Sequence, residues 1–130
     1  MIAIRILFGM LLLVLSYTVP ARADELVMFG QQGCPFCAAW NREIGRVYAN
    51  TDEAKRLPLR QVDIHAARPA DLRAIAGIHF TPTFVVIHCG READRIVGYA
   101  GQELFWEQLD AALKSIDAAA PASSGASCAK

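Results

Sequence analysis

The chain has 130 residues, and its 13 Lys and Arg residues balance its 13 Asp and Glu residues. This length allows one domain, and the balanced charge excludes the strongly basic class of protein that binds nucleic acid or an anionic surface. We therefore expect no nucleic-acid partner.

The first 23 residues have the pattern of a secretory leader. One positive charge at Arg5 precedes an almost wholly apolar run over residues 6–19, and Ala21 and Ala23 supply the small residues of an A-x-A cleavage site. We expect a cleavable signal peptide over 1–23 and a periplasmic protein with no stable membrane insertion after cleavage. The alternative is an uncleaved N-terminal anchor, for which the apolar run is short.

The mature chain begins with a strand, a turn and a helix. Glu25–Phe29 is a short apolar segment that predicts a buried strand, and residues 30–33 form the turn after it. The following helix runs to about Asn50. Its buried face is predicted from residues that recur at spacings of three and four: Cys37, Trp40, Ile44, Val47 and Tyr48.

The middle of the chain predicts an edge strand and a short helix. Leu59–Ile64 alternates imperfectly between polar and apolar residues, which favours an edge of the sheet. Pro69 then opens a short helix with Leu72 and Ile75 turned inward, and Gly77 suits the position just past its end.

The last part of the chain predicts a hairpin and a final helix. Phe84–Ile87 is continuously apolar and predicts a central strand, Cys89-Gly90 predicts a tight turn, and Ala93–Val97 returns as a second strand. Residues 118–130 are small and polar, as in a flexible tail. The final helix before this tail has an apolar stripe: Phe105, Leu109, Ala112 and Ile116.

The order of these elements, β-α-β-α-β-β-α, predicts an α/β fold with a mixed four-stranded sheet and helices on both faces. The first two strands require a right-handed crossover, and the last two form a hairpin. The end of the first strand and the start of the third then meet at one edge, so that Cys34 lies beside Thr81-Pro82.

Two cysteines at the start of the first helix carry the predicted chemistry. Cys34 lies at the helix N-terminus, where unpaired N–H groups and the helix dipole favour a thiolate, and Pro35 suits the first helical position. Cys34 is predicted to be exposed and to attack a partner's disulfide. Cys37 begins the buried face and is predicted to resolve the mixed disulfide by closing a redox-active Cys34–Cys37 disulfide. Phe36 between them is expected to tune access.

A C-x-x-C pair can also be half of a zinc site. Zinc needs two further ligands, and neither the other cysteines nor the histidines form a ligand motif. We therefore expect no metal and no cofactor. A non-catalytic module that uses the same two thiols to carry a metal or to sense redox state stays as an alternative function.

These motifs together resemble the thioredoxin superfamily over residues 24–117. The resemblance is carried by Cys34-Pro35-Phe36-Cys37 followed by Thr81-Pro82, a combination more specific than either motif alone. It implies a thioredoxin-like fold, a cis Pro82 that faces the disulfide, and a Thr81 backbone that pairs with the substrate. Pro35 and Phe36 complete the implied substrate-binding surface.

Within this superfamily the chain most resembles the small exported SoxS-type regulatory thioredoxins of bacterial sulfur oxidation. The segments 28–37 and 98–106 carry this resemblance. It implies reduction of a disulfide or mixed adduct on a periplasmic partner protein and recharging by a membrane electron donor.

Two departures separate the chain from related families. Met28 stands where thioredoxins have a buried Asp, and Gln31-Gln32 stand where glutaredoxins normally have a basic residue that holds glutathione. A glutaredoxin-like, glutathione-dependent enzyme stays as an alternative.

The other two cysteines could form a structural disulfide. The predicted topology places the Cys89 turn at the sheet end remote from Cys34, where the last helix also finishes, and Cys128 on the tail could reach it. The alternatives are free thiols or intermolecular pairing.

Overall fold

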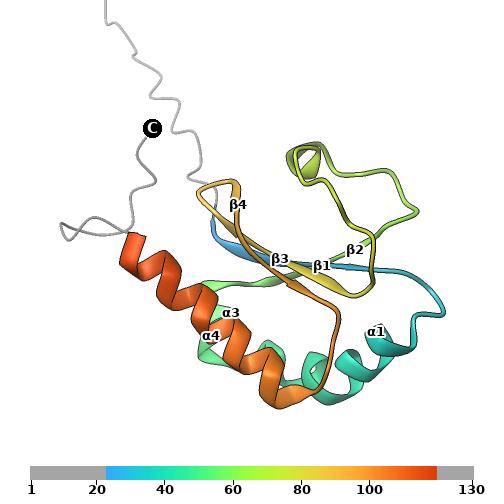
Figure 1. The fold of residues 1–130 in the computed structure, drawn as a ribbon, viewed down its shortest axis with the longest axis horizontal. Helices are drawn as coiled ribbons and strands as arrows, with labels where there is room; N and C mark the ends of the chain where they lie inside the picture. The colour runs from blue at the N-terminus through green and yellow to red at the C-terminus, as the bar shows by residue number, and fades with distance from the viewer. Residues whose placement is uncertain (1–22, 120–130) are drawn as a thin grey trace, which may run out of the picture.

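The computed structural model of this chain describes residues 23–119 (Figure 1). The leader predicted over 1–23 therefore lies outside the described residues except for Ala23. The predicted tail over 118–130 also lies outside them, apart from two residues that continue the last helix. Among the described residues, no helix is both long enough and apolar enough to cross a bilayer.

The four predicted strands form one mixed sheet in the order β2-β1-β3-β4. Strand β1 pairs in parallel with β2 and antiparallel with β3, and β3 and β4 form the antiparallel hairpin. The predicted positions of the edge strand and of the central strand are thereby confirmed. The strands are β1 (Glu25–Gly30), β2 (Leu59–Asp63), β3 (Thr83–His88) and β4 (Arg91–Val97).

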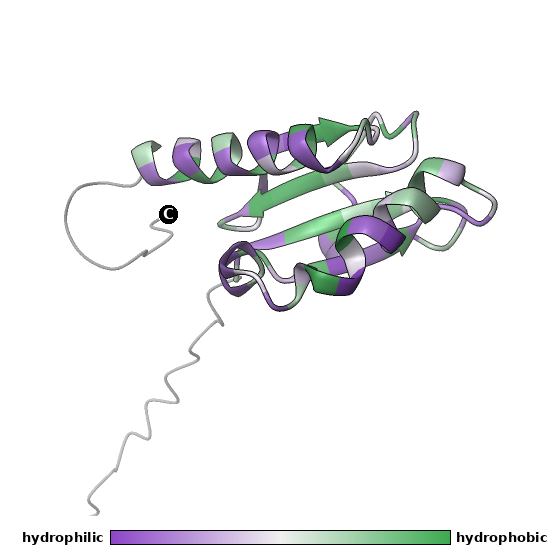
Figure 2. Cartoon of the chain, turned by 90° about the horizontal axis from the view of Figure 1, so that it is seen from below, coloured by the Kyte–Doolittle hydropathy of each residue, from purple (hydrophilic) through white to green (hydrophobic). Residues whose placement is uncertain are grey.

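The middle residues of the two central strands, 26–29 in β1 and 84–87 in β3, are all apolar because both faces of these strands are covered. Successive side chains of a strand point to opposite faces. In β1, Leu26 and Met28 belong to one core cluster, whereas Val27 and Phe29 belong to another. All four side chains are at most 2% exposed. Figure 2 shows the same pattern, with green strands at the centre and helices that alternate between green and purple.

All the α-helices pack against one face of the sheet (Figure 1). The centre of this layer is an aromatic cluster in which the Trp40 ring lies 5.1 Å from Phe84 and 5.6 Å from Phe105. The predicted apolar stripe of the last helix is buried in the same core. The α-helices are α1 (Pro35–Trp40), α2 (Arg46–Tyr48), α3 (Asp52–Arg56) and α4 (Gln102–Ala119).

The first predicted helix contains an unpredicted π-helical segment, η1 (Asn41–Gly45), between α1 and α2. A Cβ atom at Gly45 would lie 3.2 Å from the Trp40 ring, so the glycine lets the indole pack closely against the helix. The wider π turn shifts the helical register. As a result Tyr48 is buried, whereas Val47, predicted to face the core, is 51% exposed.

The opposite face of the sheet is covered by the chain between β2 and β3 (Figure 1). The short helix predicted from Pro69 is only a single 3₁₀ turn, η2 (Ala70–Leu72). The Ile75 N–H donates to the Leu72 carbonyl at 3.0 Å, so both apolar side chains reach the sheet through three-residue turns. A full α-helix is not needed to bury these two side chains.

Candidate active site

Cys34 and Cys37 form a disulfide at the N-terminus of α1. Gly33 has a φ of 74°, a conformation that favours glycine, and leads the chain into the helix. Cys34 is the N-cap, and Pro35 is the first residue of the helix, as predicted. The Cys37 N–H donates to Cys34 Sγ at 3.1 Å. A negative charge on this sulfur is therefore favoured by a directed N–H group and by the positive end of the helix dipole.

The two cysteines are almost equally buried, which differs from the prediction of an exposed Cys34. Cys34 is 7% exposed and Cys37 is 6% exposed. Cys34 is covered because its Sγ lies 3.4 Å from the Thr81 carbonyl oxygen of the loop before β3. Cys37 Sγ instead faces β1, where a Cβ atom at Gly30 would lie 3.5 Å from it. The sulfurs thus differ in what they contact rather than in how much surface they expose.

The loop beside Cys34 contains a cis peptide bond between Thr81 and Pro82, as the family resemblance implies. Pro82 is buried, and its carbonyl accepts a hydrogen bond of 2.7 Å from the Gly98 N–H at the end of β4. The Thr83 hydroxyl donates to the Phe80 carbonyl at 2.7 Å. The loop is thereby fixed at the point where it meets Cys34.

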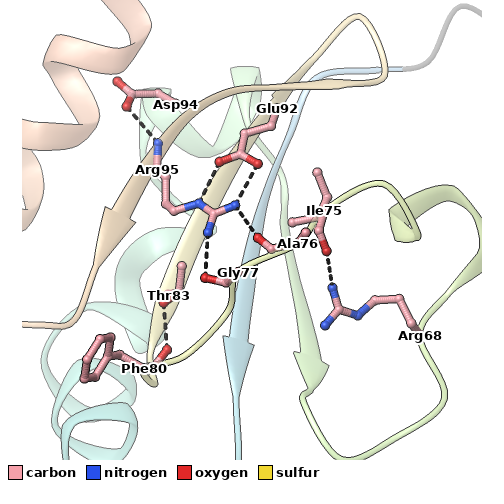
Figure 3. A network of polar contacts seen from close by, with 9 residues as sticks. All are labelled: Arg68, Ile75, Ala76, Gly77, Phe80, Thr83, Glu92, Asp94 and Arg95. Atoms are coloured by element: carbon pink, nitrogen blue, oxygen red, sulfur yellow. Dashed lines mark hydrogen bonds and ion pairs between the residues drawn. The ribbon is translucent and has the colours of Figure 1, made fainter.

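Arg95 on β4 anchors the chain that leads into this loop, as Figure 3 shows. Its guanidinium donates to the Ala76 and Gly77 carbonyls at 2.9 and 3.0 Å and pairs with Glu92 at 2.6 Å. Arg68 holds the same segment from the other side by donating to the Ile75 carbonyl at 2.9 Å. The sequence does not indicate this anchoring, since the carbonyls that Arg95 contacts are distant in the chain.

A chain of polar contacts runs from the loop to the end of β2. Gln31 Nε2 donates to Thr81 Oγ1 at 3.2 Å, and Gln31 Oε1 lies 2.8 Å from His65 Nε2. The His65 N–H donates to Asp63 Oδ1 at 2.8 Å. These contacts of Gln31 were not predicted from the sequence, where Gln31 stands in the place of the basic residue that holds glutathione in glutaredoxins. Its position in the turn, three residues before Cys34, was the available signal.

A cavity of about 290 Å³ reaches Cys37 from the β2 side. Its polar lining includes Asp63 and the side-chain amides of Asn41 and Gln61, which are hydrogen-bonded to each other at 3.1 Å. Met28 also lines it and brings no titratable group. Polar access to Cys37 therefore comes from β2 and η1 rather than from the strand before the motif.

Two exposed aromatic side chains belong to the segments that form the site. Phe36 in the C-x-x-C motif is 58% exposed, and Phe80 before the cis-proline is 68% exposed. Phe36 was singled out from the sequence and Phe80 was not. Large apolar side chains exposed together with a reactive pair are typical of surfaces that bind another molecule.

A larger hollow of about 740 Å³ lies between η1 and the start of α4 and contains neither sulfur. It is lined by Trp106 and by glutamates that include Glu43. The Tyr99 hydroxyl donates to Glu43, and partial burial together with this carboxylate raises the pKa of Tyr99 to about 12. We assign no redox chemistry to this hollow.

The remaining predicted cysteine site is described only in part. Cys89 lies in the β3–β4 turn, at the end of the sheet remote from Cys34 as expected, and Cys128 lies outside the described residues. No cysteine among residues 23–119 is a free thiol. The Cys89–Cys128 disulfide stays a prediction. Within the same range, no group of three or more His, Cys, Asp or Glu side chains could hold a metal ion.

Comparisons with known proteins agree with this geometry. The family described as the thioredoxin-like domain matches residues 20–113. No curated protein matches the chain. Among solved structures, the chain is similar to the reduced form of the periplasmic thioredoxin SoxS from Paracoccus pantotrophus, with 34% identity and a TM-score of 0.68. This match covers 72% of the present chain and 98% of the SoxS chain.

Proposed function

This chain belongs to the thioredoxin-like family, and we propose that it is an exported thiol-disulfide oxidoreductase that reduces a disulfide or mixed adduct on a partner protein. One observation carries the proposal: the Cys34–Cys37 disulfide caps a helix directly beside the cis Thr81-Pro82 loop. A buried structural disulfide would need neither the helix N-terminus nor the loop.

In the proposed reaction, the Cys34 thiolate attacks one sulfur of the partner's disulfide. The partner's other sulfur leaves as a thiolate, and a mixed disulfide with Cys34 remains. Cys37 then attacks Cys34 Sγ, which closes the Cys34–Cys37 disulfide and releases the second thiolate of the partner. Two electrons pass to the partner, and two protons complete its thiols. The Cys37 N–H that now contacts Cys34 Sγ would stabilise the attacking thiolate.

We propose that the partner binds as an extended segment along the loop before β3. The Thr81 carbonyl lies 3.4 Å from Cys34 Sγ, so a segment paired with this backbone would present its sulfur to Cys34. Pro35, Phe36 and Pro82 would border the bound segment, and the exposed ring of Phe80 would add apolar contact. Protein disulfide substrates rather than small molecules fit such an open surface.

Periplasmic location and the SoxS-type role are also proposals. They are supported by the leader pattern over 1–23 and by the similarity to a protein named as a periplasmic thioredoxin. A reductase in an oxidising compartment must be recharged with electrons, and we propose a membrane electron donor for this step. A sulfur-oxidation protein is the proposed partner.

A trapping experiment tests the roles of the two sulfurs. Cys37→Ser should accumulate mixed disulfides with partner proteins, because Cys34 can attack but nothing resolves the product. Cys34→Ser should lose insulin-reduction activity, and the Cys34→Ser/Cys37→Ser double variant should trap nothing. An active Cys34→Ser variant would overturn the assignment.

The alternatives predict different observations. A metal-carrying module would purify with about one metal ion per pair of reduced thiols and would not reduce insulin. A redox-sensing module would trap a partner but would show no turnover. A glutaredoxin-like enzyme would need glutathione for turnover, whereas the proposed enzyme accepts electrons from a dithiol such as dithiothreitol.

A further inference from the structure

The two sulfurs of the C-x-x-C pair are about equally buried, so exposure does not distinguish the attacking thiol from the resolving one. Cys34 is 7% exposed and Cys37 is 6% exposed. The helix N-terminus favours a negative charge on Cys34 Sγ, but Cys37 lies in the first turn of the same helix and shares part of this effect. The different roles proposed above therefore call for a second influence, one that acts on Cys37 alone.

The cavity of about 290 Å³ beside Cys37 offers such an influence. Among the residues that line it, Asp63 is the one with a charged side chain, and Cys34 is not one of them. The space is polar and large enough to admit water. Cys37 and Asp63 therefore face the same polar space, from which Cys34 is absent. The rest of its polar side chains are neutral amides: Gln31, Gln32, Asn41 and Gln61.

The pairing of β1 with β2 places Asp63 on the side of the sheet that faces Cys37. Gly30 is paired with Asp63 in the parallel register, so side chains at these two positions point to the same face. A Cβ atom at Gly30 would lie 3.5 Å from Cys37 Sγ. The Cβ atom of Asp63 is one strand spacing, about 4.8 Å, to the side of that position. Gln61, two residues earlier on β2, points to the same face, since it donates to Asn41 of η1 at 3.1 Å.

A hydrogen bond holds the Asp63 carboxylate at the end of β2. Its Oδ1 accepts from the His65 N–H at 2.8 Å, and the His65 ring contacts Gln31 Oε1 at 2.8 Å. A positive charge on that ring would partly offset the carboxylate. The charged residues of η1, Arg42 and Glu43, do not line the cavity, and the β1 residues that line it are neutral. Asp63 is therefore the described charge that shares the cavity with the resolving thiol.

We propose that Asp63 is a positioning residue for this thiol: its carboxylate keeps Cys37 protonated in the reduced protein, so that Cys34 alone becomes the attacking thiolate. A negative charge across a partly enclosed space disfavours a second one. The inference rests on the proposed function, because it assigns the attack to Cys34. It adds a side chain from β2 that no sequence motif indicates.

The same charge sets the rate of the resolving step. In the mixed disulfide, the Cys37 thiol gives its proton to water that enters the cavity, and the thiolate forms an S–S bond with Cys34 Sγ. The partner's sulfur leaves as a thiolate and takes up a proton from solvent, so this step consumes no further oxidant or reductant. Asp63 lowers the fraction of Cys37 thiolate and thereby prolongs the life of the mixed disulfide.

The test measures the ionisation of Cys37 in the full chain with Cys34→Ser, where no charge on Cys34 interferes. The reduced protein is alkylated with iodoacetamide over a range of pH, and Cys37 is followed by peptide mass spectrometry. We expect the midpoint of the Cys37 rate above about 8.5, the value of a free cysteine. Adding Asp63→Asn should lower it by at least about half a pH unit. The asparagine keeps an oxygen that can accept from the His65 N–H, so the turn after β2 is retained.

Two matched variants separate the charge from a structural role. Asp63→Glu keeps the carboxylate and should hold the Cys37 midpoint near that of the parent. Asp110→Asn removes the same charge from an exposed position on α4, outside the cavity, and should leave the midpoint unchanged.

A second readout follows the resolving step in the protein that has both cysteines. The reduced protein is mixed with a small peptide disulfide, quenched with acid at intervals, and analysed by mass spectrometry for peptide bound to Cys34. With Asp63→Asn this mixed disulfide should decay about twofold faster at pH 7. The fraction of Cys37 thiolate rises about threefold for half a pH unit, and each thiolate is somewhat less nucleophilic.

A Cys37 midpoint below about 8.5 in Cys34→Ser would overturn the proposal, and this result requires no Asp63 variant. A smaller shift in Asp63→Asn than about half a pH unit, the same shift in Asp63→Glu, or slower decay of the mixed disulfide would overturn it as well. None of these results concerns whether Cys34→Ser reduces insulin, so failure here is distinguishable from failure of the proposed function.

Discussion

Replacing Tyr48 with phenylalanine should lower the free energy of unfolding at neutral pH. The same substitution should remove one cause of the loss of stability at alkaline pH. The Tyr48 hydroxyl is buried and donates to the Leu57 carbonyl at 2.8 Å. The phenylalanine keeps the ring, which stacks on Trp106 with centroids 6.0 Å apart, and loses only the hydroxyl. Loss of one such hydrogen bond should lower the free energy of unfolding by about 1 kcal/mol at pH 7.

The pH dependence follows from the direction of the pKa shift. Burial, with a smaller contribution from the nearby Glu53 carboxylate, raises the pKa of Tyr48 above its usual value. The phenol therefore stays protonated in the folded protein, whereas in the unfolded chain it ionises above about pH 10. Stability from this difference is complete below pH 10 and is lost as the pH rises, by about 1.4 kcal/mol at pH 11.

The assay compares urea unfolding of the oxidised protein and of Tyr48→Phe at pH 7 and at pH 11. The variant lacks the titrating group, so the difference in free energy of unfolding should change by about 1.4 kcal/mol in its favour between the two pH values. Other tyrosines titrate equally in both proteins and cancel. Ile44→Val is the matched control, because it removes one buried methyl group and should cost about 1 kcal/mol at both pH values. The reasoning is refuted if the Tyr48→Phe difference is the same at pH 7 and pH 11.

Two further substitutions test the loop anchor and a helix cap. Arg95→Met removes the hydrogen bonds to Ala76 and Gly77, and should lower the free energy of unfolding by about 2 kcal/mol and slow insulin reduction, because the loop beside Cys34 is loosened. Unchanged insulin reduction would show that the anchor does not matter for the site. Thr51→Ala removes the N-cap of α3 and should cost about 1 kcal/mol in urea unfolding while insulin reduction stays at the parent rate.

The pattern of apolar residues was sufficient to predict the sheet. A strand buried on both faces is continuously apolar, and a strand at the edge of the sheet has polar residues among its apolar ones. The apolar run of β3 indicated a central strand, and the interrupted run of β2 indicated an edge. Periodicity was less reliable inside the first helix. There the π segment shifted the register, so that Val47 faces solvent although its spacing suits the core.

The predicted topology placed Cys34 beside Thr81-Pro82, but it did not predict how each sulfur is covered or which polar groups reach it. Cys34 and Cys37 are placed by a local feature, the start of a helix. The burial of Cys34 instead depends on the Thr81 carbonyl, and polar access to Cys37 depends on Asn41 and Gln61. No local pattern encodes these contacts.

The sequence by itself predicted the cysteine pair and the loop beside it, since a C-x-x-C motif at a helix start and a Thr-Pro before an apolar strand can be recognised without coordinates. Only the tertiary structure decided how deeply each sulfur is buried and which polar side chains lie near it. The register between β1 and β3 brings Asp24 to His88, and the Thr81 carbonyl lies 3.4 Å from Cys34 Sγ and covers a sulfur that was predicted to be exposed. Such distances are set by strand pairing and packing, which join residues that the order of the chain keeps apart.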